Sequence, residues 1–187
     1  EGVHYQQLAI GYRHENPLRR RYYDSGSNEG IAHYNEELML RAGLFENTPH
    51  SKTVMWNFMR LRALRVEVDV GLATGELSLE DAAGLFSKKV LVDRATALKE
   101  SAFYAGNPGI ALAYQVGKHQ LMKLVADSIE KEGNNFEFQK IHDAVWKDGN
   151  VPFALLNWEL NGNKDYIDAI DEDPLTGVAP PKPEFDR

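Results

Sequence analysis

Apolar residues recur at spacings of three and four along most of the chain, which is the period of an α-helix with one buried face. The longest stripe lies within residues 48–72 and consists of Val54, Phe58, Leu61, Leu64, Val68 and Leu72. Similar stripes predict further helices at about 28–42, 79–86, 90–103, 107–132, 134–145 and 152–160. Hardly any stretch alternates as a β-strand does. The pattern therefore predicts an all-α protein.

Polar residues at the ends of these stripes indicate where helices begin. The segment Ser78–Asp81 has the spacing of a capping box. Asn107–Pro108 is typical of a helix start, because Asn caps the helix and Pro fits its first turn. Arg65 and Asp69 lie four residues apart on one helix face, so we expect them to form an ion pair.

The chain divides into a helical region and a tail. Residues 1–160 carry all the predicted helices, and 187 residues are enough for one hydrophobic core. Residues 161–187 are predicted to form a loop or an extended strap, because proline disfavours helix interiors. The prolines of this segment are Pro174, Pro180, Pro181 and Pro183.

Composition removes several functional classes. The net charge of -7 argues against nucleic acid as a partner, because phosphate backbones favour clustered Lys and Arg. No apolar run reaches the roughly 20 residues of a membrane span, and a signal peptide is expected only outside this sequence. With no cysteine, a metal could be held only by His, Asp and Glu. The motifs of serine hydrolases, nucleotide hydrolases and dinucleotide-binding proteins are missing from the sequence.

The first four residues carry a pattern with a chemical meaning. Glu1-Gly2-Val3-His4 has the form of the zinc motif His-Glu-x-x-His without its leading His. In that motif the histidines bind zinc and the Glu acts on the bound water, whose pKa falls to about 7. His4 is thus a candidate zinc ligand and Glu1 a candidate general base. Such a short match also arises by chance, so a packed or surface histidine remains an alternative for His4.

Glu29 is the candidate for a further zinc ligand. It lies in the predicted first turn of a capped helix, and a His-His-Glu set leaves the fourth zinc position open for water and substrate. The alternative is that the helix dipole alone favours a carboxylate there. His33 follows four residues later on the same side, as a substrate-facing residue, a support for a ligand, or a surface histidine.

Two tyrosines and two arginines complete the candidate set. Tyr104 or Tyr114 could stabilise the oxyanion of a tetrahedral intermediate, although core packing is the simpler interpretation of Tyr114. Arg62 and Arg65 could bind a substrate carboxylate, because a guanidinium group matches its geometry. For Arg65, the pair with Asp69 is the competing interpretation.

Several segments together resemble a known family. Glu29-Gly30-Ile31-Ala32-His33-Tyr34-Asn35-Glu36 is similar to the segment Glu-Gly-Trp-Ala-x-Tyr-x-Glu of the bacterial family named domain of unknown function 885. The other matching segments are Glu1–Leu8, Arg62–Arg65, Val68–Leu72, Asn107–Lys118, Ile141–Val145 and Gly149–Pro152. The family is placed among zinc peptidases with a glutamate third ligand.

The resemblance implies a zincin-like helical metallopeptidase fold, of which this chain is the C-terminal part. It implies zinc bound by His4 and Glu29, with Glu1 as general base, and a small peptide-like substrate. It also implies that an N-terminal part of the same protein completes the site, so the chain alone should bind zinc weakly. Family members are often exported, periplasmic or lipid-anchored, which is the expectation here.

The sequence departs from the family pattern at several positions. Val3 stands where members usually have Pro-Gly before the histidine, Ile31 replaces the usual Trp, and Ala73 stands where a His is often found. Ile31 and Ala73 favour the alternative of a catalytically inactive helical scaffold that binds a peptide or a partner protein without metal. A hydrolase of non-peptide esters or amides is a third possibility.

Overall fold

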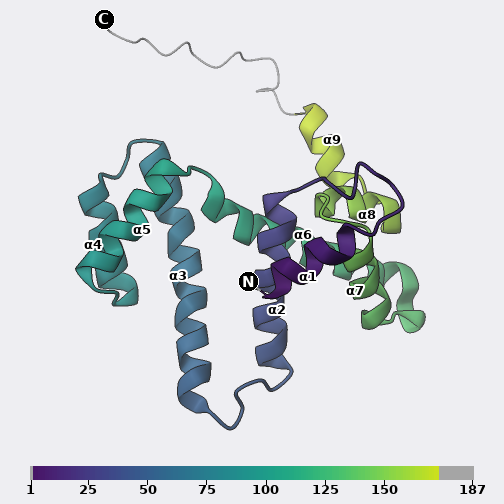
Figure 1. The fold of residues 1–187 in the computed structure, drawn as a ribbon, viewed down its shortest axis with the longest axis horizontal. Helices are drawn as coiled ribbons and strands as arrows, with labels where there is room; N and C mark the ends of the chain where they lie inside the picture. Colours follow the sequence, from purple (N-terminus) through teal and green to yellow (C-terminus); the bar gives the residue numbers. More distant parts are fainter. Residues whose placement is uncertain (1, 173–187) are drawn as a thin grey trace, which may run out of the picture.

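A computed structural model describes residues 2–172 of the chain. Within those residues every regular element is a helix, which confirms the all-α prediction (Figure 1). The helices are α1 (Gly2–Gly11), α2 (Ser25–Arg41), α3 (Pro49–Ala73), α4 (Leu79–Val90), α5 (Arg94–Gly106), α6 (Ile110–Glu132), the short 3-10 helix η1 (Gly133–Asn135), α7 (Phe138–Lys147), α8 (Phe153–Asn161) and α9 (Asp165–Glu172). No helix of this part is long and apolar enough to cross a bilayer.

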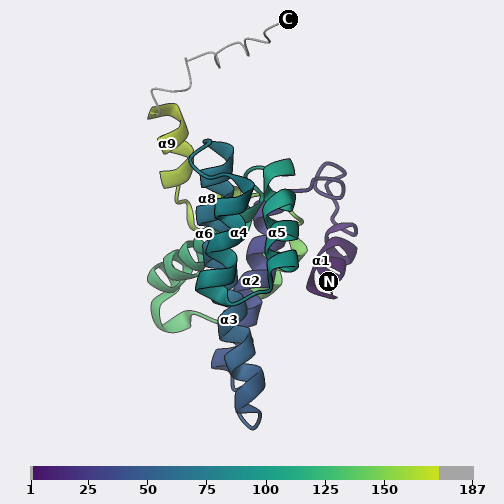
Figure 2. The same cartoon turned by 90° about the vertical axis from the view of Figure 1, so that its left-hand side faces the viewer.

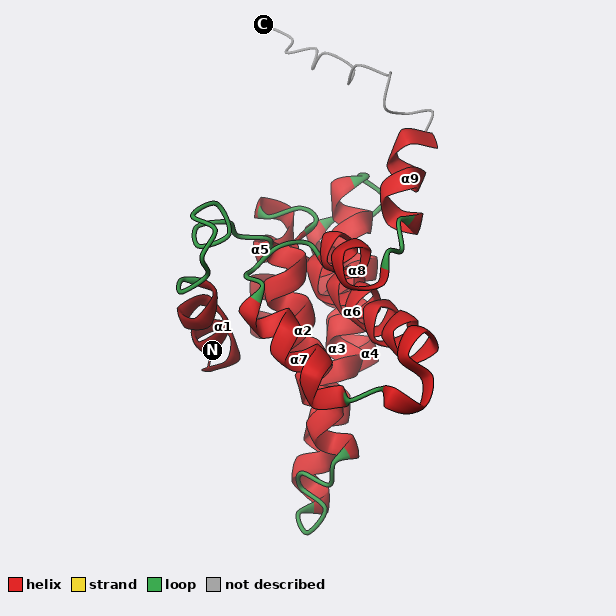
Figure 3. Cartoon of the chain, turned by 90° about the vertical axis from the view of Figure 1, so that its right-hand side faces the viewer, coloured by secondary structure: helices red, strands yellow, loops and turns green. Residues whose placement is uncertain are grey.

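The helices form two groups that meet at α6. One group, which we call the local unit, consists of α3, α4 and α5, and Figure 2 shows α4 beside α5. The other, the crossing unit, consists of α1, α2, α6, α7 and α8, with α6 packed against both α2 and α8 (Figure 3). Because α6 also packs against α3, it joins the two units.

Each unit has its own hydrophobic core. The core of the local unit contains Leu64, Val68, Phe86, Ala97 and Tyr104 among its buried members. The core of the crossing unit contains Ile31, Leu121, Leu124, Val145, Phe153 and Leu156. The stripe predicted along residues 48–72 therefore supplies its second half to a core, whereas Val54 and Phe58 remain about half exposed.

Glycines set the distance between α2 and α6. A Cβ atom added to Gly30 would lie 2.4 Å from the carbonyl carbon of Gly117, and one added to Gly117 would lie 1.8 Å from the carbonyl oxygen of Gly26. Real Cβ atoms do not approach other atoms so closely, so the backbones of the two helices touch. This close crossing brings the side chains that flank it on α2 and α6 together.

The local unit confirms one predicted cap and corrects two other predictions. Ser78 and Asp81 form the capping box at the start of α4. Asp69 does not pair with Arg65, because its buried carboxylate accepts the amide N–H groups of Gly109 (2.8 Å) and Ala111 (2.9 Å). Asp69 thus caps α6 from α3 and takes the role predicted for Asn107, whose side chain instead donates to a carbonyl oxygen of α5.

The tail prediction differs from the structure in its first part. Residues 165–172 form the helix α9, although 161–187 were expected to be a loop or strap. The Asn163 side chain accepts the N–H of Asp165 (2.8 Å), and Lys123 on α6 pairs with the Asp165 carboxylate (3.2 Å). These contacts fix the start of the helix, and Asp168 adds an acidic side chain to its first turn. The predicted prolines all lie outside the described residues.

Candidate active site

The candidate side chains of α2 lie on one face of that helix. Glu29, His33 and Glu36 are four and three residues apart, so they project to the same side. The helix begins earlier than predicted, because the Asp24 carboxylate accepts the N–H of Ser27 (2.6 Å) and caps it. Glu29 is therefore in the second turn and not in the first. The helix dipole acts mainly within the first turn, so it does not by itself explain a carboxylate at this position.

His4 of α1 and Glu29 of α2 are brought together. The His4 Nε2 atom lies 3.5 Å from the Glu29 Oε2 atom, and the two side chains are 27% and 18% exposed. The other ring nitrogen of His4 is buried and has no hydrogen-bond partner within the described residues. The pair is thus partly exposed to solvent, and one buried nitrogen of His4 lacks a hydrogen-bond partner within the described residues.

The pair fits part of a zinc site. Two ligands of a tetrahedral zinc ion, each bound at about 2.0–2.2 Å, lie about 3.3 Å from each other, which is close to the observed separation. Within residues 2–172, however, no three His, Asp or Glu side chains are grouped so that they could hold a metal. Glu1, the predicted general base, lies outside the described residues. The described part of the chain therefore brings together two side chains that the sequence predicts as zinc ligands.

Tyr114 of α6 lies beside Glu29. Burial raises the pKa of Tyr114 to about 12, and the Glu29 carboxylate adds to the rise through its charge and a side-chain hydrogen bond. The nearby guanidinium groups of Arg65 and Arg62 act in the opposite direction. The phenol is therefore protonated at neutral pH and can donate a hydrogen bond, as an oxyanion stabiliser must.

Tyr23 is a neighbour of the site that the sequence did not reveal. Burial, together with the charges of Glu29 and Asp24, raises the pKa of its hydroxyl. The hydroxyl also donates to the Asn28 side chain (3.3 Å). Because Tyr23 lies in the connection before α2, no helical periodicity marks it.

Arg62 and Arg65 each hold a glutamate. Arg62 donates to Glu36 (2.7 Å), and Arg65 donates to Glu100 through Nε (2.8 Å) and Nη2 (3.0 Å). A substrate carboxylate at either arginine would therefore meet a guanidinium group whose charge is largely balanced. Their predicted role in substrate binding stays a prediction, and Arg65 contributes to a cavity described below.

His33 is buried and is not a surface histidine. Only 3% of the residue is exposed, and its Nε2 atom lies 3.3 Å from the Gln115 side chain of α6. Its Nδ1 atom is 4.0 Å from Glu36 and has no hydrogen-bond partner within the described residues. His33 therefore lies behind the site, between α2 and α6, where its predicted contact with substrate would require a rearrangement.

Tyr104 lies deeper than Tyr114. It is 3% exposed in the core of the local unit, and burial raises its pKa well above the ordinary range. The Arg65 guanidinium carbon is 5.8 Å from the centre of its ring. Tyr104 and Tyr114 line a common cavity, and the Glu29 carboxylate contributes to the raised pKa of Tyr114.

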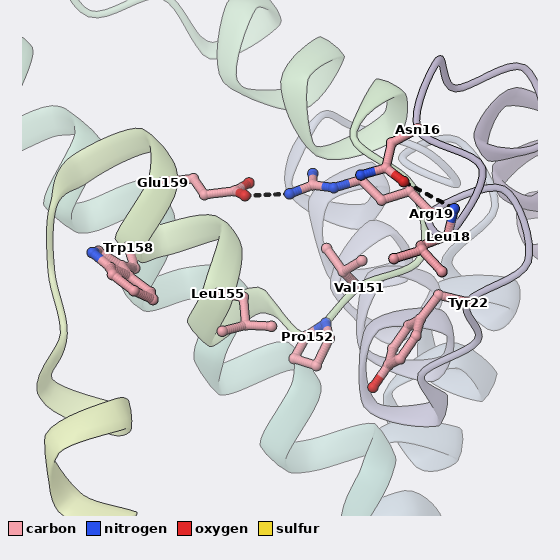
Figure 4. A pocket seen from close by; sticks show the side chains of 9 residues that line it. All are labelled: Asn16, Leu18, Arg19, Tyr22, Val151, Pro152, Leu155, Trp158 and Glu159. Carbon is pink, nitrogen blue, oxygen red and sulfur yellow. Dashed lines mark hydrogen bonds and ion pairs between the residues drawn. The ribbon is translucent and has the colours of Figure 1, made fainter.

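The structure also contains a cavity away from these residues. It has a volume of about 600 Å³ and lies between the connection before α2 and helix α8 (Figure 4). Leu18, Tyr22 and Leu155 give it an apolar lining, and the ion pair of Arg19 with Glu159 spans one side. None of its lining residues is among the site residues predicted from the sequence.

The comparisons with known proteins decide the family. The sequence model of the family described as "Bacterial protein of unknown function (DUF885)" matches residues 2–160. The chain belongs to this family. No curated protein matches it.

A solved structure has a similar fold over most of this chain. The chain is similar to a protein described as "the putative lipoprotein from Colwellia psychrerythraea", with 28% sequence identity and a TM-score of 0.78. The similarity covers 87% of this chain and 28% of the length of that protein. The DUF885 match includes His4, Glu29 and Tyr114 and ends within α8, so α9 lies beyond it.

Proposed function

We propose that the protein is part of a zinc-dependent, peptidase-like hydrolase with a zincin-like helical fold, and that this chain is its C-terminal part. The observation that carries the proposal is the approach of His4 and Glu29, 3.5 Å apart, from two different helices. The sequence predicts the same two side chains as ligands, His4 from the partial zinc motif and Glu29 from its position in the second helix and the family resemblance. DUF885 membership supports the proposal through the resemblance described above.

In this proposal His4 and Glu29 hold the zinc ion. When bound, zinc supplies a water molecule of lowered pKa and polarises a carbonyl group. The residues of the chain then have separate tasks. The neutral Tyr114 hydroxyl donates to the developing oxyanion, and Tyr23 helps to enclose Glu29. Glu1 is proposed as the base that accepts the proton of the attacking water.

The proposal requires a further zinc ligand from outside the described residues. We place it at a histidine directly before Glu1 in the intact protein, because that residue would complete the His-Glu-x-x-His motif. The chain spans 28% of the length of the related structure, so most of such a protein lies outside this sequence. An exported or lipid-anchored location is proposed from the description of that relative as a lipoprotein and from the family resemblance.

The second candidate function is a scaffold that binds a peptide or partner protein without metal. It is favoured by the fact that residues 2–172 group no three metal-binding side chains. The departures from the family pattern support it less than the sequence suggested. Ile31 is 2% exposed in the core of the crossing unit, and Ala73 is exposed at the end of α3.

Zinc stoichiometry separates the two candidates. The hydrolase predicts about one zinc ion per molecule of intact protein, measured by mass spectrometry after extensive dialysis. The substitution Glu29→Gln should remove this zinc, whereas Glu130→Gln, at an exposed position of α6, should retain it. An intact protein without stoichiometric zinc would favour the scaffold, and full zinc in Glu29→Gln would remove Glu29 from the site.

A further inference from the structure

A cavity of about 410 Å³ lies between α3, α5 and the start of α6. Its polar lining consists of Arg65, Thr96, Lys99, Glu100, Tyr104 and Tyr114, and we call it the Arg65 cavity. Tyr114 belongs both to this cavity and to the surroundings of Glu29. The cavity therefore shares Tyr114 with the surroundings of the His4–Glu29 pair.

The charge of the Arg65 cavity favours an anion. Arg65 and Lys99 carry two positive charges and Glu100 carries one negative charge, so the lining has a net charge of about +1. The net charge of the cavity lining is thus opposite in sign to the net charge of the whole chain, which is -7. Within residues 2–172 Lys99 forms no ion pair, and its charge is not balanced by a neighbour as that of Arg65 is.

The donors of the cavity suit a carboxylate group. Glu100 holds two nitrogens of Arg65 and so fixes the plane of the guanidinium group, while the third nitrogen makes no hydrogen bond within residues 2–172. The hydroxyl of Tyr104 is protonated at neutral pH and can donate as well. A carboxylate accepts several hydrogen bonds at once, and those from charged donors are the stronger ones.

We propose that the Arg65 cavity binds a carboxylate of the substrate, close to the amide bond that the His4–Glu29 site would cleave. The bound molecule is a substrate only if the proposed function holds. The binding of a carboxylate itself does not depend on that function. The proposed substrate class is short peptides or N-acyl amino acids with a free carboxylate beside the reacting amide. Tyr114 links the two parts because it lines the cavity together with Arg65 and its pKa responds to the charge of Glu29.

The test compares the binding of an acid and its neutral amide. N-acetyl-alanine and N-acetyl-alaninamide would be titrated against the full chain by NMR, first with a chelator present so that no metal is needed. The acid should bind roughly tenfold tighter or better, since a charge-assisted hydrogen bond contributes about 1.5–3 kcal/mol. Equal affinities, or no measurable binding of the acid, would overturn the inference.

Variants identify the cavity as the source of the preference. Lys99→Gln should reduce acid binding severalfold and leave amide binding unchanged, whereas Lys52→Gln, an exposed lysine of α3, changes the net charge equally and should have no effect. The double variant Arg65→Gln, Glu100→Gln keeps the local net charge but removes the guanidinium donors, and it avoids an unpaired Glu100. It too should lose the preference for the acid. Equal losses in Lys52→Gln and Lys99→Gln would also overturn the inference.

The same measurements keep the two proposals apart. If the acid binds through Lys99 in the full chain but the intact protein holds no zinc, the cavity assignment stands and the hydrolase does not. If the intact protein holds zinc but acid and amide bind alike, the hydrolase stands and the cavity assignment is wrong.

Discussion

The local unit and the crossing unit of this chain are built in different ways. The local unit uses consecutive helices, residues 49–106, whose apolar faces meet over short connections. The crossing unit joins α1 and α2 to α6, α7 and α8, which are separated from them by that whole stretch. One is assembled from neighbours in the sequence, and the other depends on contacts between distant segments.

The two units also differ in what they bury. In the local unit Asp69 and Ser101 have their buried side-chain oxygens satisfied, whereas Ser87 Oγ and Arg62 Nη1 are buried without a partner in the described residues. In the crossing unit the ring nitrogens Nδ1 of His4 and His33 are buried without a partner in the described residues. Unsatisfied buried groups cost stability and are typical of places with a task other than folding. The proposed zinc ligands His4 and Glu29 both belong to the crossing unit, and the unsatisfied ring nitrogens of that unit include one of His4 itself.

The largest effect on stability is expected at the close backbone contact between α2 and α6. Gly117→Ala places a Cβ atom on the backbone of Gly26 and should reduce the free energy of unfolding by about 3 kcal/mol or more. Gly84→Ala in α4 is the matched control, because a Cβ atom there meets no atom within 4 Å and should be neutral or stabilise by up to about 1 kcal/mol. Urea unfolding followed by circular dichroism measures both. Similar stability of the two variants would show that α2 and α6 do not touch.

A somewhat smaller effect is expected where the two units meet. Asp69→Ala leaves the buried amide of Ala111 and its neighbour Gly109 without their acceptor, and should cost about 2–4 kcal/mol. Asp143→Ala, at a half-exposed position of α7, should change stability by less than about 0.5 kcal/mol. If Asp69→Ala unfolded with the midpoint of the wild type, the cap from α3 to α6 would have no energetic role.

The third prediction concerns activity and sharpens the assignment of chemistry to the crossing unit. In the intact, zinc-loaded protein Tyr114→Phe should lower kcat by about 100-fold with little change in KM, because one oxyanion donor is lost. Tyr12→Phe, in which an exposed hydroxyl is removed, should retain full activity. Steady-state kinetics on a short peptide would show the difference. An unchanged kcat in Tyr114→Phe would assign the tyrosine to packing alone.

The smallest effect is a pH dependence within the crossing unit. Burial lowers the pKa of His142, whose Nε2 atom is 3.0 Å from the Tyr34 hydroxyl. Since the unfolded chain then binds the proton more readily, the contribution of His142 to stability is complete above the unfolded pKa of about 6.5 and is lost as the pH falls through the lower folded pKa. His142→Gln should flatten the dependence of the urea midpoint on pH between about 7.5 and 5. The exposed His119→Gln should not, and equal curves for both variants would contradict the prediction.

How far the sequence could predict the fold follows from the same comparison. The helices of the local unit and the capping box at Ser78 depend on residues within a few positions of one another, and periodicity and local polar spacing report them directly. The pair of Arg65 with Asp69 failed although the spacing was correct. Arg65 donates to Glu100 of α5 instead, and Asp69 accepts from the start of α6. Sequence spacing carries no information about these partners from other helices.

The site was predictable to the extent that a motif marks it. The Glu-x-x-His pattern predicted His4 and the segment around Glu29 predicted Glu29, and the fold brings these two side chains together. Tyr23 and the burial of His33 could not be predicted, because they depend on how α1 and α6 cover α2. The start of α2 at Ser25 was missed by a few residues, and that shift changed the interpretation of Glu29.

The cap that Asp69 provides determines which distant substitutions could disturb Tyr114. Its carboxylate fixes the first amides of α6, and Tyr114 follows less than one turn later on the same helix. The orientation of the Tyr114 phenol therefore depends on α3, which belongs to the local unit. Substitutions that loosen the packing of Phe86 or Val68 would shift α3 and so disturb the position of Tyr114. If the chain is part of the proposed hydrolase, a screen for inactive mutants would recover them together with replacements of Tyr114.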